Sequence, residues 1–404
     1  MHTLGDAAGV TLGGTTTADK SKIEWTDATW NPIRGCSRVS EGCRNCYAER
    51  TAARFAGAGQ PFEGVAFPIG GRGLDVKLES LANGGKSRGW TGDVHFIPEL
   101  LELPLRWKRP RKIFVNSMSD LFHEKTDVRW IDQICAVMMV CPQHIFQVLT
   151  KRPERMRNYL CNVGARQIEP HMQRLRPGIA RLDWPWRNIW WGVSVEDQKT
   201  ADERIPLLLE TPAAVRWVSY EPALAAVNFS NWILQPCRSC GHVHTGQCQF
   251  LLQDEHGSYP CLCPASYTYK SQLDWMVAGG ESGPGARATH PAWIRAVRDQ
   301  CYAARVPFFF KQWGEWLNST QLKPAFTDAE LDRAIFKTVR REPDANQPNA
   351  GLDDLYFRVS KKRAGRLLDG CEWNQFPGEC RTCHGTGRVE APNAQFTRPC
   401  PNCR

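Results

Sequence analysis

The stretch around which the chain is organised runs W-N-P-I-R-G-C over residues 30–36, continues to Cys43, and reaches C-Y-A-E over residues 46–49. Its three cysteines, Cys36, Cys43 and Cys46, have the spacing C-x6-C-x2-C. Three thiolates on one loop can hold three irons of a [4Fe–4S] cluster and leave the fourth iron open to a substrate or a cofactor. The stretch therefore predicts an iron–sulfur site.

Two other interpretations of these cysteines stay open, a zinc knuckle and three ordinary thiols. A zinc site needs four ligands, and no fourth Cys or His lies within the forty residues after Cys46. A helix predicted over residues 47–55 starts directly after Cys46, where backbone amides and the helix dipole stabilise a thiolate. These points favour the iron–sulfur cluster.

The composition bounds the class of protein. The chain has 404 residues, enough for one large domain with appendages, and 42 % of them are hydrophobic, enough for a packed core. A net charge of +9 favours a polyanionic partner such as nucleic acid without establishing one. The 17 cysteines cluster at metal-binding spacings, which indicates a reducing, cytoplasmic location. No apolar run predicts a membrane span, and residues 1–21 are expected to be a flexible leader.

Short apolar runs alternate with amphipathic segments along most of the chain. A strand is expected within residues 23–33, and six more are predicted at residues 112–116, 144–151, 188–194, 215–221, 273–280 and 306–311. Helices are predicted at residues 128–140, after Pro153, and at residues 199–210 and 291–304. Buried strands that alternate with helices predict βα units and a mostly parallel sheet within one domain, residues 22–320.

Each of the six later strands ends in polar residues. The carboxyl ends of parallel strands meet at one edge of a sheet, where binding and catalytic sites are built. One or two polar strand ends would carry no weight, but all six strands have them: Asn116, Ser117 and Asp120; Thr150 and Lys151; Ser194 and Glu196; Ser219 and Glu221; Glu281 and Ser282; Lys311 and Gln312. We therefore expect a shared site at this edge, beside the cysteines.

Two further groups of cysteines predict zinc sites. An insertion over residues 235–265 has little core of its own and contains Cys237, Cys240, Cys261 and Cys263, with Cys248, His242 and His244 nearby. Which four of these bind metal stays open. The tail, residues 371–404, has the spacing C-x2-C-x16-C-x2-C that is typical of a zinc ribbon, at Cys380, Cys383, Cys400 and Cys403. Residues 321–370 form a polar and basic extension, with a helix expected over residues 328–340.

Seven segments in order carry a resemblance to a known family: NCYAER, VNSMSDLFHE, VLTKRPERM, WWGVSVED, WVSYEPAL, VAGGESGPGAR and FFFKQWGEW. The chain resembles the phage-associated three-Cys-motif family of radical-SAM-like proteins, within the radical S-adenosylmethionine superfamily. The likeness covers residues 23–317 and a basic stretch at residues 352–368. Outside it, the first half of the tail resembles the cysteine repeats of J-domain chaperones.

The resemblance implies a partial (β/α)6 TIM-like barrel in which Cys36, Cys43 and Cys46 hold a [4Fe–4S] cluster. The open iron would chelate S-adenosylmethionine, and one electron would cleave this cofactor to a 5′-deoxyadenosyl radical that abstracts hydrogen from a substrate. The superfamily's usual spacing is C-x3-C-x2-C, so the first gap here is longer. Its Gly-Gly-Glu motif usually follows the second strand, whereas the G-G-E of this chain, residues 279–281, follows a later one.

The residues expected to contact S-adenosylmethionine share strand-end positions or this motif: Asn116, Ser119, Ser194, Glu221, Gly279, Gly280 and Glu281. Lys151 and Glu196 fit a substrate site equally well. Asp120, His123 and Glu124 are close in sequence and are either a metal-binding cluster or a polar loop that lines the site.

Three functions are consistent with these features. The first is a radical S-adenosylmethionine enzyme that modifies or repairs a nucleic acid or base, favoured by the charge of +9, the ribbon and the phage setting of the family. The second is the same chemistry on a peptide or small metabolite. The third is a non-catalytic, zinc-stapled nucleic-acid-binding phage protein, which the glutamates at the strand ends oppose. A companion protein encoded nearby is a further expected partner.

Overall fold

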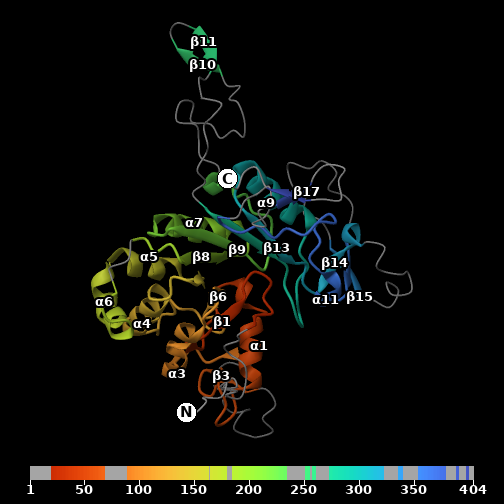
Figure 1. The fold of residues 1–404 in the computed structure, drawn as a ribbon. Helices are drawn as coiled ribbons and strands as arrows, with labels where there is room; N and C mark the ends of the chain where they lie inside the picture. Colours follow the sequence, from red (N-terminus) through yellow and green to blue (C-terminus); the bar gives the residue numbers. More distant parts are fainter. Residues whose placement is uncertain are drawn as a thin grey trace. The chain divides into compact units, whose positions relative to one another are not determined.

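The computed structural model describes residues 20–68, 89–162, 164–179, 184–233, 251–254, 257–260, 273–322, 335–339, 354–378, 388–390 and 397–399. The chain divides into two compact units, residues 1–190 and 191–404, and the division falls inside strand β8 (Ile189–Val195). The described residues are a mixture of helices and strands, as the sequence predicts (Figure 1).

A seven-stranded sheet contains all the predicted strands, in the order β1-β6-β7-β8-β9-β12-β13. The pairs β1–β6, β6–β7, β9–β12 and β12–β13 are parallel. The strands besides β8 are β1 Ala28–Trp30, β6 Lys112–Val115, β7 Ile145–Thr150, β9 Val215–Tyr220, β12 Trp275–Gly279 and β13 Phe308–Gln312. Most of their residues are buried, as continuous apolar runs predict for parallel strands. This order is compatible with a partial barrel.

In residues 1–190, helices follow the strands at the predicted places. Helix α4 (Val128–Met139) starts at Asp127, whose side chain accepts a hydrogen bond from the Arg129 amide, and buries Ile131, Ile134 and Val137. Helices α4 and α6 pack on each other (Figure 1). The other helices among the described residues of this unit are α1 Tyr47–Arg54, α3 Pro98–Leu101, α5 Pro153–Asn162 and α6 Gly164–Leu175, with 3-10 turns η1 Glu41–Cys43 and η2 Leu103–Arg106.

Two short antiparallel strand pairs are formed by residues that precede and follow Cys36 in the sequence. Strand β2 (Ile33–Arg34) pairs with β5 (His95–Phe96), and β3 (Ala66–Phe67) pairs with β4 (Gly89–Trp90). Trp30 is fully buried, and its indole donates to the Leu100 carbonyl at 2.7 Å. The chain therefore leaves β1 along a fixed path into the cysteines.

In residues 191–404, two helices have ends that the sequence explains. Helix α7 (Gln198–Glu210) starts with a capping box between Asp197 and Thr200. Helix α9 (Pro291–Ala304) starts with His290 as N-cap and Pro291 in its first turn, and its bounds are those predicted. The short helices in the described part of this unit are α8 Ser230–Ile233, η3 Ser319–Gln321 and α11 Lys361–Ala364, and strands β10 Leu251–Asp254 and β11 Gly257–Pro260 pair antiparallel.

The extension predicted to be polar and basic contains a second sheet. Strands β14 (Trp316–Asn318), β16 (Asp354–Arg358) and β15 (Ile335–Val339) pair in that order, antiparallel. The predicted helix over residues 328–340 is wrong for residues 335–339, because these residues pair with β16, and residues 328–334 lie outside the described residues.

The segment 371–376 continues the main sheet of this unit at β13. Phe310 N–H donates to the Trp373 carbonyl at 2.9 Å, and Gln375 N–H donates to the Phe308 carbonyl at 3.2 Å. Strands β17 (Arg388–Glu390) and β18 (Thr397–Pro399) form a hairpin within the predicted ribbon. All eight cysteines of the two predicted zinc sites, in the insertion and in the tail, lie outside the described residues.

We predict that Gly35→Ala lowers the free energy of unfolding by about 3 kcal/mol, because Gly35 has φ +96° and a Cβ there would lie 2.2 Å from the Asp93 carbonyl oxygen. The matched control is Gly59→Ala, at φ +70° with no atom within 4 Å of the added Cβ, which should lose only about 1 kcal/mol. Urea unfolding followed by tryptophan fluorescence measures both. Equal losses would mean that the close approach at Gly35 contributes nothing.

Candidate functional site

The cysteine loop, residues 35–46, is held at both of its ends. Gly35 forms an isolated parallel bridge with Ser119 after β6, and Cys46 is the N-cap residue of α1. Cys43 ends the 3-10 turn η1 between them. All three cysteines are half-buried free thiols. The predicted helix after Cys46 is confirmed as α1.

The three thiols differ in their electrostatics. Burial, then the charge of Asp120, raises the pKa of Cys36, while Arg152 opposes both. Burial also raises the pKa of Cys46 and outweighs the amides of Glu49 and Ala48 at the helix start. Burial acts in the same direction on Cys43, but Lys151 and hydrogen bonds at residues 39 and 40 outweigh it, so the pKa of Cys43 lies below its ordinary value. A metal ion binds cysteine as the thiolate, so burial at Cys36 and Cys46 opposes the charged form that a metal needs, while the surroundings of Cys43 favour it.

The donor set fits an iron–sulfur cluster in its chemistry. Three free thiols lie on one loop, and their charges interact with one another. Within the described ranges, however, no group of three or more His, Cys, Asp or Glu side chains is arranged to hold a metal ion. This holds for Asp120, His123 and Glu124 as it does for the three cysteines, and a metal at either group stays a prediction.

Asp120 and Arg152 form a buried ion pair beside the cysteine loop. Asp120 is 5 % exposed and Arg152 is 8 % exposed, and Nη1 lies 3.1 Å from Oδ2. The Asp120 carboxylate also accepts from Thr150 Oγ1 at 2.7 Å, from the Phe122 amide at 2.9 Å and from the Lys151 amide at 3.1 Å. A buried carboxylate with this many donors is a structural anchor.

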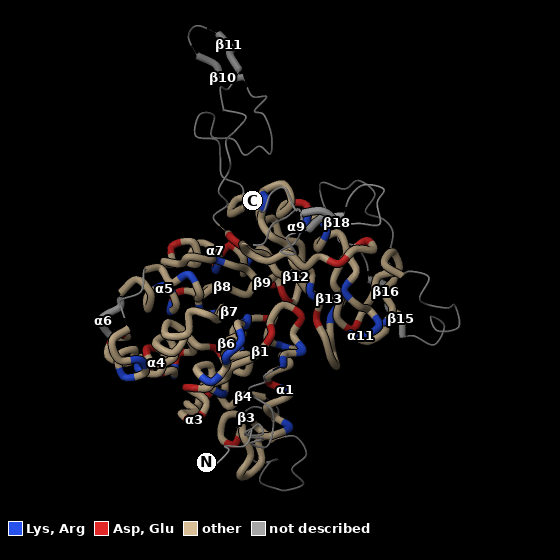
Figure 2. Tube along the Cα trace, viewed as in Figure 1, with Lys and Arg blue, Asp and Glu red and all other residues tan. Residues whose placement is uncertain are grey.

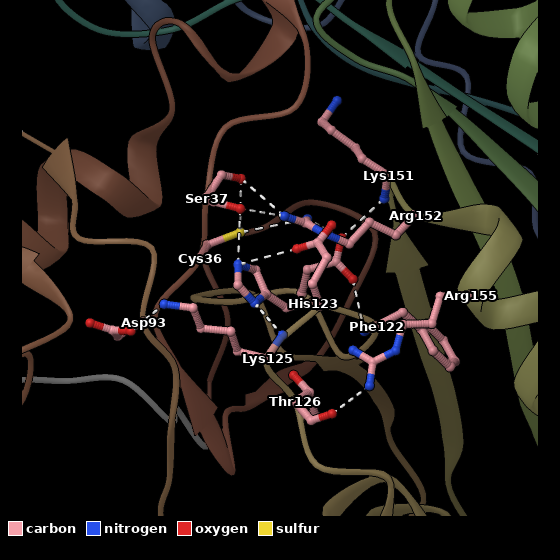
Figure 3. Close-up of polar contacts among 12 residues, drawn as sticks. Cys36, Ser37, Asp93, Phe122, His123, Lys125, Thr126, Lys151, Arg152 and Arg155 are labelled. Atoms are coloured by element: carbon pink, nitrogen blue, oxygen red, sulfur yellow. Dashed lines mark hydrogen bonds and ion pairs between the residues drawn. The ribbon is translucent and has the colours of Figure 1, made fainter.

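Arg152 also reaches the cysteine loop (Figure 3). Nη2 donates to Ser37 Oγ at 2.7 Å and to the Ser37 carbonyl at 3.3 Å, Nη1 lies 4.0 Å from Cys36 Sγ, and Nε donates to Glu124 at 2.7 Å. Each donor direction of the guanidinium therefore meets a group of the site, and the sulfur contact is the longest.

His123 completes this network as a neutral imidazole. Its Nδ1 accepts from the Lys125 amide at 3.2 Å, which leaves the proton on Nε2, 2.9 Å from Ser37 Oγ. Burial, then the charge of Arg152, holds the pKa of His123 below its ordinary value of 6.5. The predicted polar loop of Asp120, His123 and Glu124 is thus the loop that lines the first cysteine.

A second ion pair ties the middle of the cysteine loop to α1. Arg38 Nη2 lies 2.6 Å from Oε2 of the buried Glu49, and Glu49 Oε1 accepts from the Trp90 amide at 3.0 Å. A Cβ on Gly89 would lie 2.4 Å from this oxygen, so glycine is needed there. Sequence reasoning missed Arg38, Glu49 and Arg152, although Arg152 directly follows the predicted strand-end residue Lys151.

Asn116 stands apart from the satisfied polar groups around it. It directly follows β6, in the left-handed region at φ +58°, and is 4 % exposed. Its side-chain amide nitrogen and oxygen have no hydrogen-bond partner in the described parts of the chain. Its neighbours are paired: Ser119 Oγ donates to the Ile33 carbonyl at 2.9 Å, and Ser117 Oγ donates to Asn31 at 3.2 Å. A buried amide without a partner needs an explanation, and a ligand is one.

Within residues 191–404, the glutamates at the strand ends each form an ion pair with a lysine or an arginine. Lys311 Nζ lies 2.6 Å from Glu221 Oε1, Arg204 Nη1 lies 3.2 Å from Glu196 Oε2, and Arg287 Nη2 lies 2.7 Å from Glu281 Oε1. Ser194 Oγ donates to the Glu221 carbonyl at 3.1 Å. A Cβ on Gly280 would lie 1.9 Å from the Trp313 carbonyl oxygen, so packing accounts for that glycine. A Cβ on Gly279 would lie 3.4 Å from Glu221 and Lys311, which is an ordinary contact.

The predicted residues thus fall into two sets. Within residues 1–190, the cysteines lie with Ser119, Asp120, His123, Glu124 and Lys151, and Asn116 lies nearby at the end of β6. Within residues 191–404, Ser194, Glu221, Lys311 and Gly279 lie together, and Glu196 and Glu281 are each paired with an arginine.

A family model described as "Protein of unknown function (DUF5131)" matches residues 20–377. The chain belongs to this family. The DUF5131 match includes the cysteine loop and every strand-end residue discussed above, and it ends before Cys380. No curated protein and no solved structure matches the chain.

Charge and hydropathy add little about partners. Lys and Arg are interspersed with Asp and Glu along the described trace (Figure 2). In the part of the chain that the structure describes, no helix is both long and apolar enough to cross a bilayer.

We predict that the stability of this protein falls less steeply below pH 6.5 when His123 is replaced by Gln. Because the pKa of His123 is depressed in the folded state, its neutral form contributes stability above its ordinary pKa of 6.5, and this contribution is lost as pH falls through the folded-state value. Urea unfolding of both proteins between pH 7.5 and pH 5 measures the difference. Parallel pH profiles would contradict the prediction.

Proposed function

We propose that this protein is an iron–sulfur enzyme of the radical S-adenosylmethionine type, with Cys36, Cys43 and Cys46 as the ligands of a [4Fe–4S] cluster. The observation that carries the proposal is the set of three free thiols on one fixed loop next to a parallel strand end with an unpartnered buried amide. The resemblance to radical-SAM-like proteins and the parallel sheet agree with it, and the finer form of the fold, a partial TIM-like barrel with zinc-binding appendages, belongs to the same proposal.

In this proposal, residues of the chain bind the cofactor and hold the cysteine loop in its orientation. When bound, the cluster and S-adenosylmethionine supply radical chemistry. Arg152 and Arg38 hold the cysteine loop in place through Ser37 and Glu49. Asn116 offers one donor and one acceptor to a bound group such as the amino acid end of the cofactor. Glu221, Glu281, Ser194, Gly279 and Gly280 remain candidates for cofactor contact by strand-end position alone.

A nucleic acid or base is the proposed substrate, and the cytoplasm the proposed location. The net charge of +9, the predicted ribbon and the high cysteine content support both. A peptide or small metabolite is the alternative substrate, and a companion protein is a further proposed partner.

We predict that protein purified without oxygen and reconstituted with iron and sulfide binds about four irons per chain. Alanine at Cys36, Cys43 or Cys46 should abolish most of this uptake, because each thiolate holds one iron. Iron analysis and absorption spectra measure it. The matched controls are Cys161→Ala and Cys371→Ala, two exposed cysteines that should retain full uptake. Zinc without iron in the native protein would remove the proposed chemistry and favour the non-catalytic nucleic-acid-binding protein.

We predict that Asn116→Gly weakens binding of S-adenosylmethionine at least about tenfold while the iron content stays unchanged. Glycine keeps the left-handed backbone at φ +58° and removes only the amide, so the fold should lose little stability. Titration of the reduced cluster's spectrum with the cofactor measures the affinity. Unchanged affinity would assign the buried amide another role.

A further inference from the structure

We propose that Arg152 is a positioning residue of the cysteine loop, which fixes Cys36 and Ser37 in the metal-free protein and whose permanent charge makes a bound cluster easier to reduce. The first part concerns the protein alone. The second part rests on the proposed function, because it requires that a cluster binds at Cys36, Cys43 and Cys46.

The hydrogen bonds of the Arg152 guanidinium support its role in positioning the cysteine loop (Figure 3). Its Nε and Nη1 donate to Glu124 at 2.7 Å and to Asp120 at 3.1 Å, and both acceptors belong to the loop after β6. Its Nη2 donates twice to Ser37, at 2.7 Å and 3.3 Å. A planar fork with five N–H groups can serve two segments at once, whereas a lysine ammonium has no such fixed directions. Arg152 therefore cross-links the start of the cysteine loop to the loop after β6.

The buried setting gives this cross-link its strength. Arg152 is 8 % exposed and Asp120 is 5 % exposed, so solvent competes weakly for their hydrogen bonds. Asp120 has three further donors, from Thr150, Lys151 and Phe122, and keeps its place without the arginine. Ser37 is held by Arg152 and His123 in the described contacts. Loss of Arg152 would thus release the cysteine loop more than the aspartate.

The charges around Cys36 support the effect of Arg152 on the reduction potential of a bound cluster. Arg152 Nη1 lies 4.0 Å from Cys36 Sγ, and the negative charge of Asp120 acts on the same sulfur. A reduced cluster has one more negative charge than an oxidised one, so a nearby cation favours reduction and a nearby anion opposes it. Arg152 and Asp120 should therefore shift the reduction potential in opposite directions.

Hydrogen exchange of the full-length, metal-free protein tests the positioning. In Arg152→Gln, amides of residues 36–46 should exchange at least about tenfold faster than in the native protein. Ser37→Ala, which leaves the Arg152–Asp120 pair in place, should give a smaller increase of a few fold and carries the test if Arg152→Gln does not fold. The matched control is Arg129→Gln, which removes an exposed ion pair with Asp127 and should leave the loop unchanged. Native exchange in folded Arg152→Gln or in Ser37→Ala would overturn the positioning role.

Redox titration of the reconstituted full chain tests the charge effect. Arg152→Gln should make the reduction potential more negative, Asp120→Asn should make it less negative, and Arg152→Lys should keep a value near the native one. Shifts of the first two variants in the same direction, or no shift in Arg152→Gln, would overturn the charge effect. If the native protein takes up no iron, the proposed function and the charge effect both fail, while the exchange experiment still decides the positioning.

Discussion

Burial of the Arg152 guanidinium is the interaction on which the arrangement of the cysteine loop depends. A charge in a protein interior costs several kcal/mol unless it is fully paired. Arg152 follows β7, and its partners come from two other segments: Ser37 lies after β1, and Asp120 and Glu124 lie after β6. Only the parallel order β1-β6-β7 brings the carboxyl ends of these strands together. The sheet order and the site are therefore consequences of the same packing.

The main sheet and its helices could be predicted because their signals are local. A parallel strand is buried on both faces, so it is a continuous apolar run, and all six predicted runs are strands. The predicted bounds of helix α9 are those observed: Pro291 marks its start in the sequence, and the structure shows that it ends where the chain turns to φ +58° at Arg305. Strand β15 was not predictable in this way. Its pairing partner β16 lies beyond a stretch of polar sequence, and strand preference depends on such a partner.

The sequence predicted which residues lie at the candidate site, but it did not predict which of them form ion pairs with one another. Strand-end position correctly brought Asp120 and Lys151 to the edge beside the cysteine loop. It could not show that Arg152 occupies Asp120 and Glu124, or that Glu196 and Glu281 each have an arginine of their own. A sequence indicates which ionisable groups lie at an edge of the sheet. The tertiary contacts determine whether a carboxylate there forms an internal ion pair or is available to bind a ligand.

Residues that already have protein partners hold the cysteine loop in place, whereas residues without such partners are available to bind a ligand. Ser37, Arg38, Glu49 and Asp120 all have protein partners, so they account for the fixed path of the cysteine loop and need no ligand. Asn116 has the opposite property, since both polar atoms of its buried amide lack a partner among the described residues. An unsatisfied buried amide costs about 1–3 kcal/mol, and a ligand that pairs with it recovers that cost as affinity. Under the proposed function, Asn116 is therefore a better candidate for ligand contact than the strand-end residues that already form ion pairs.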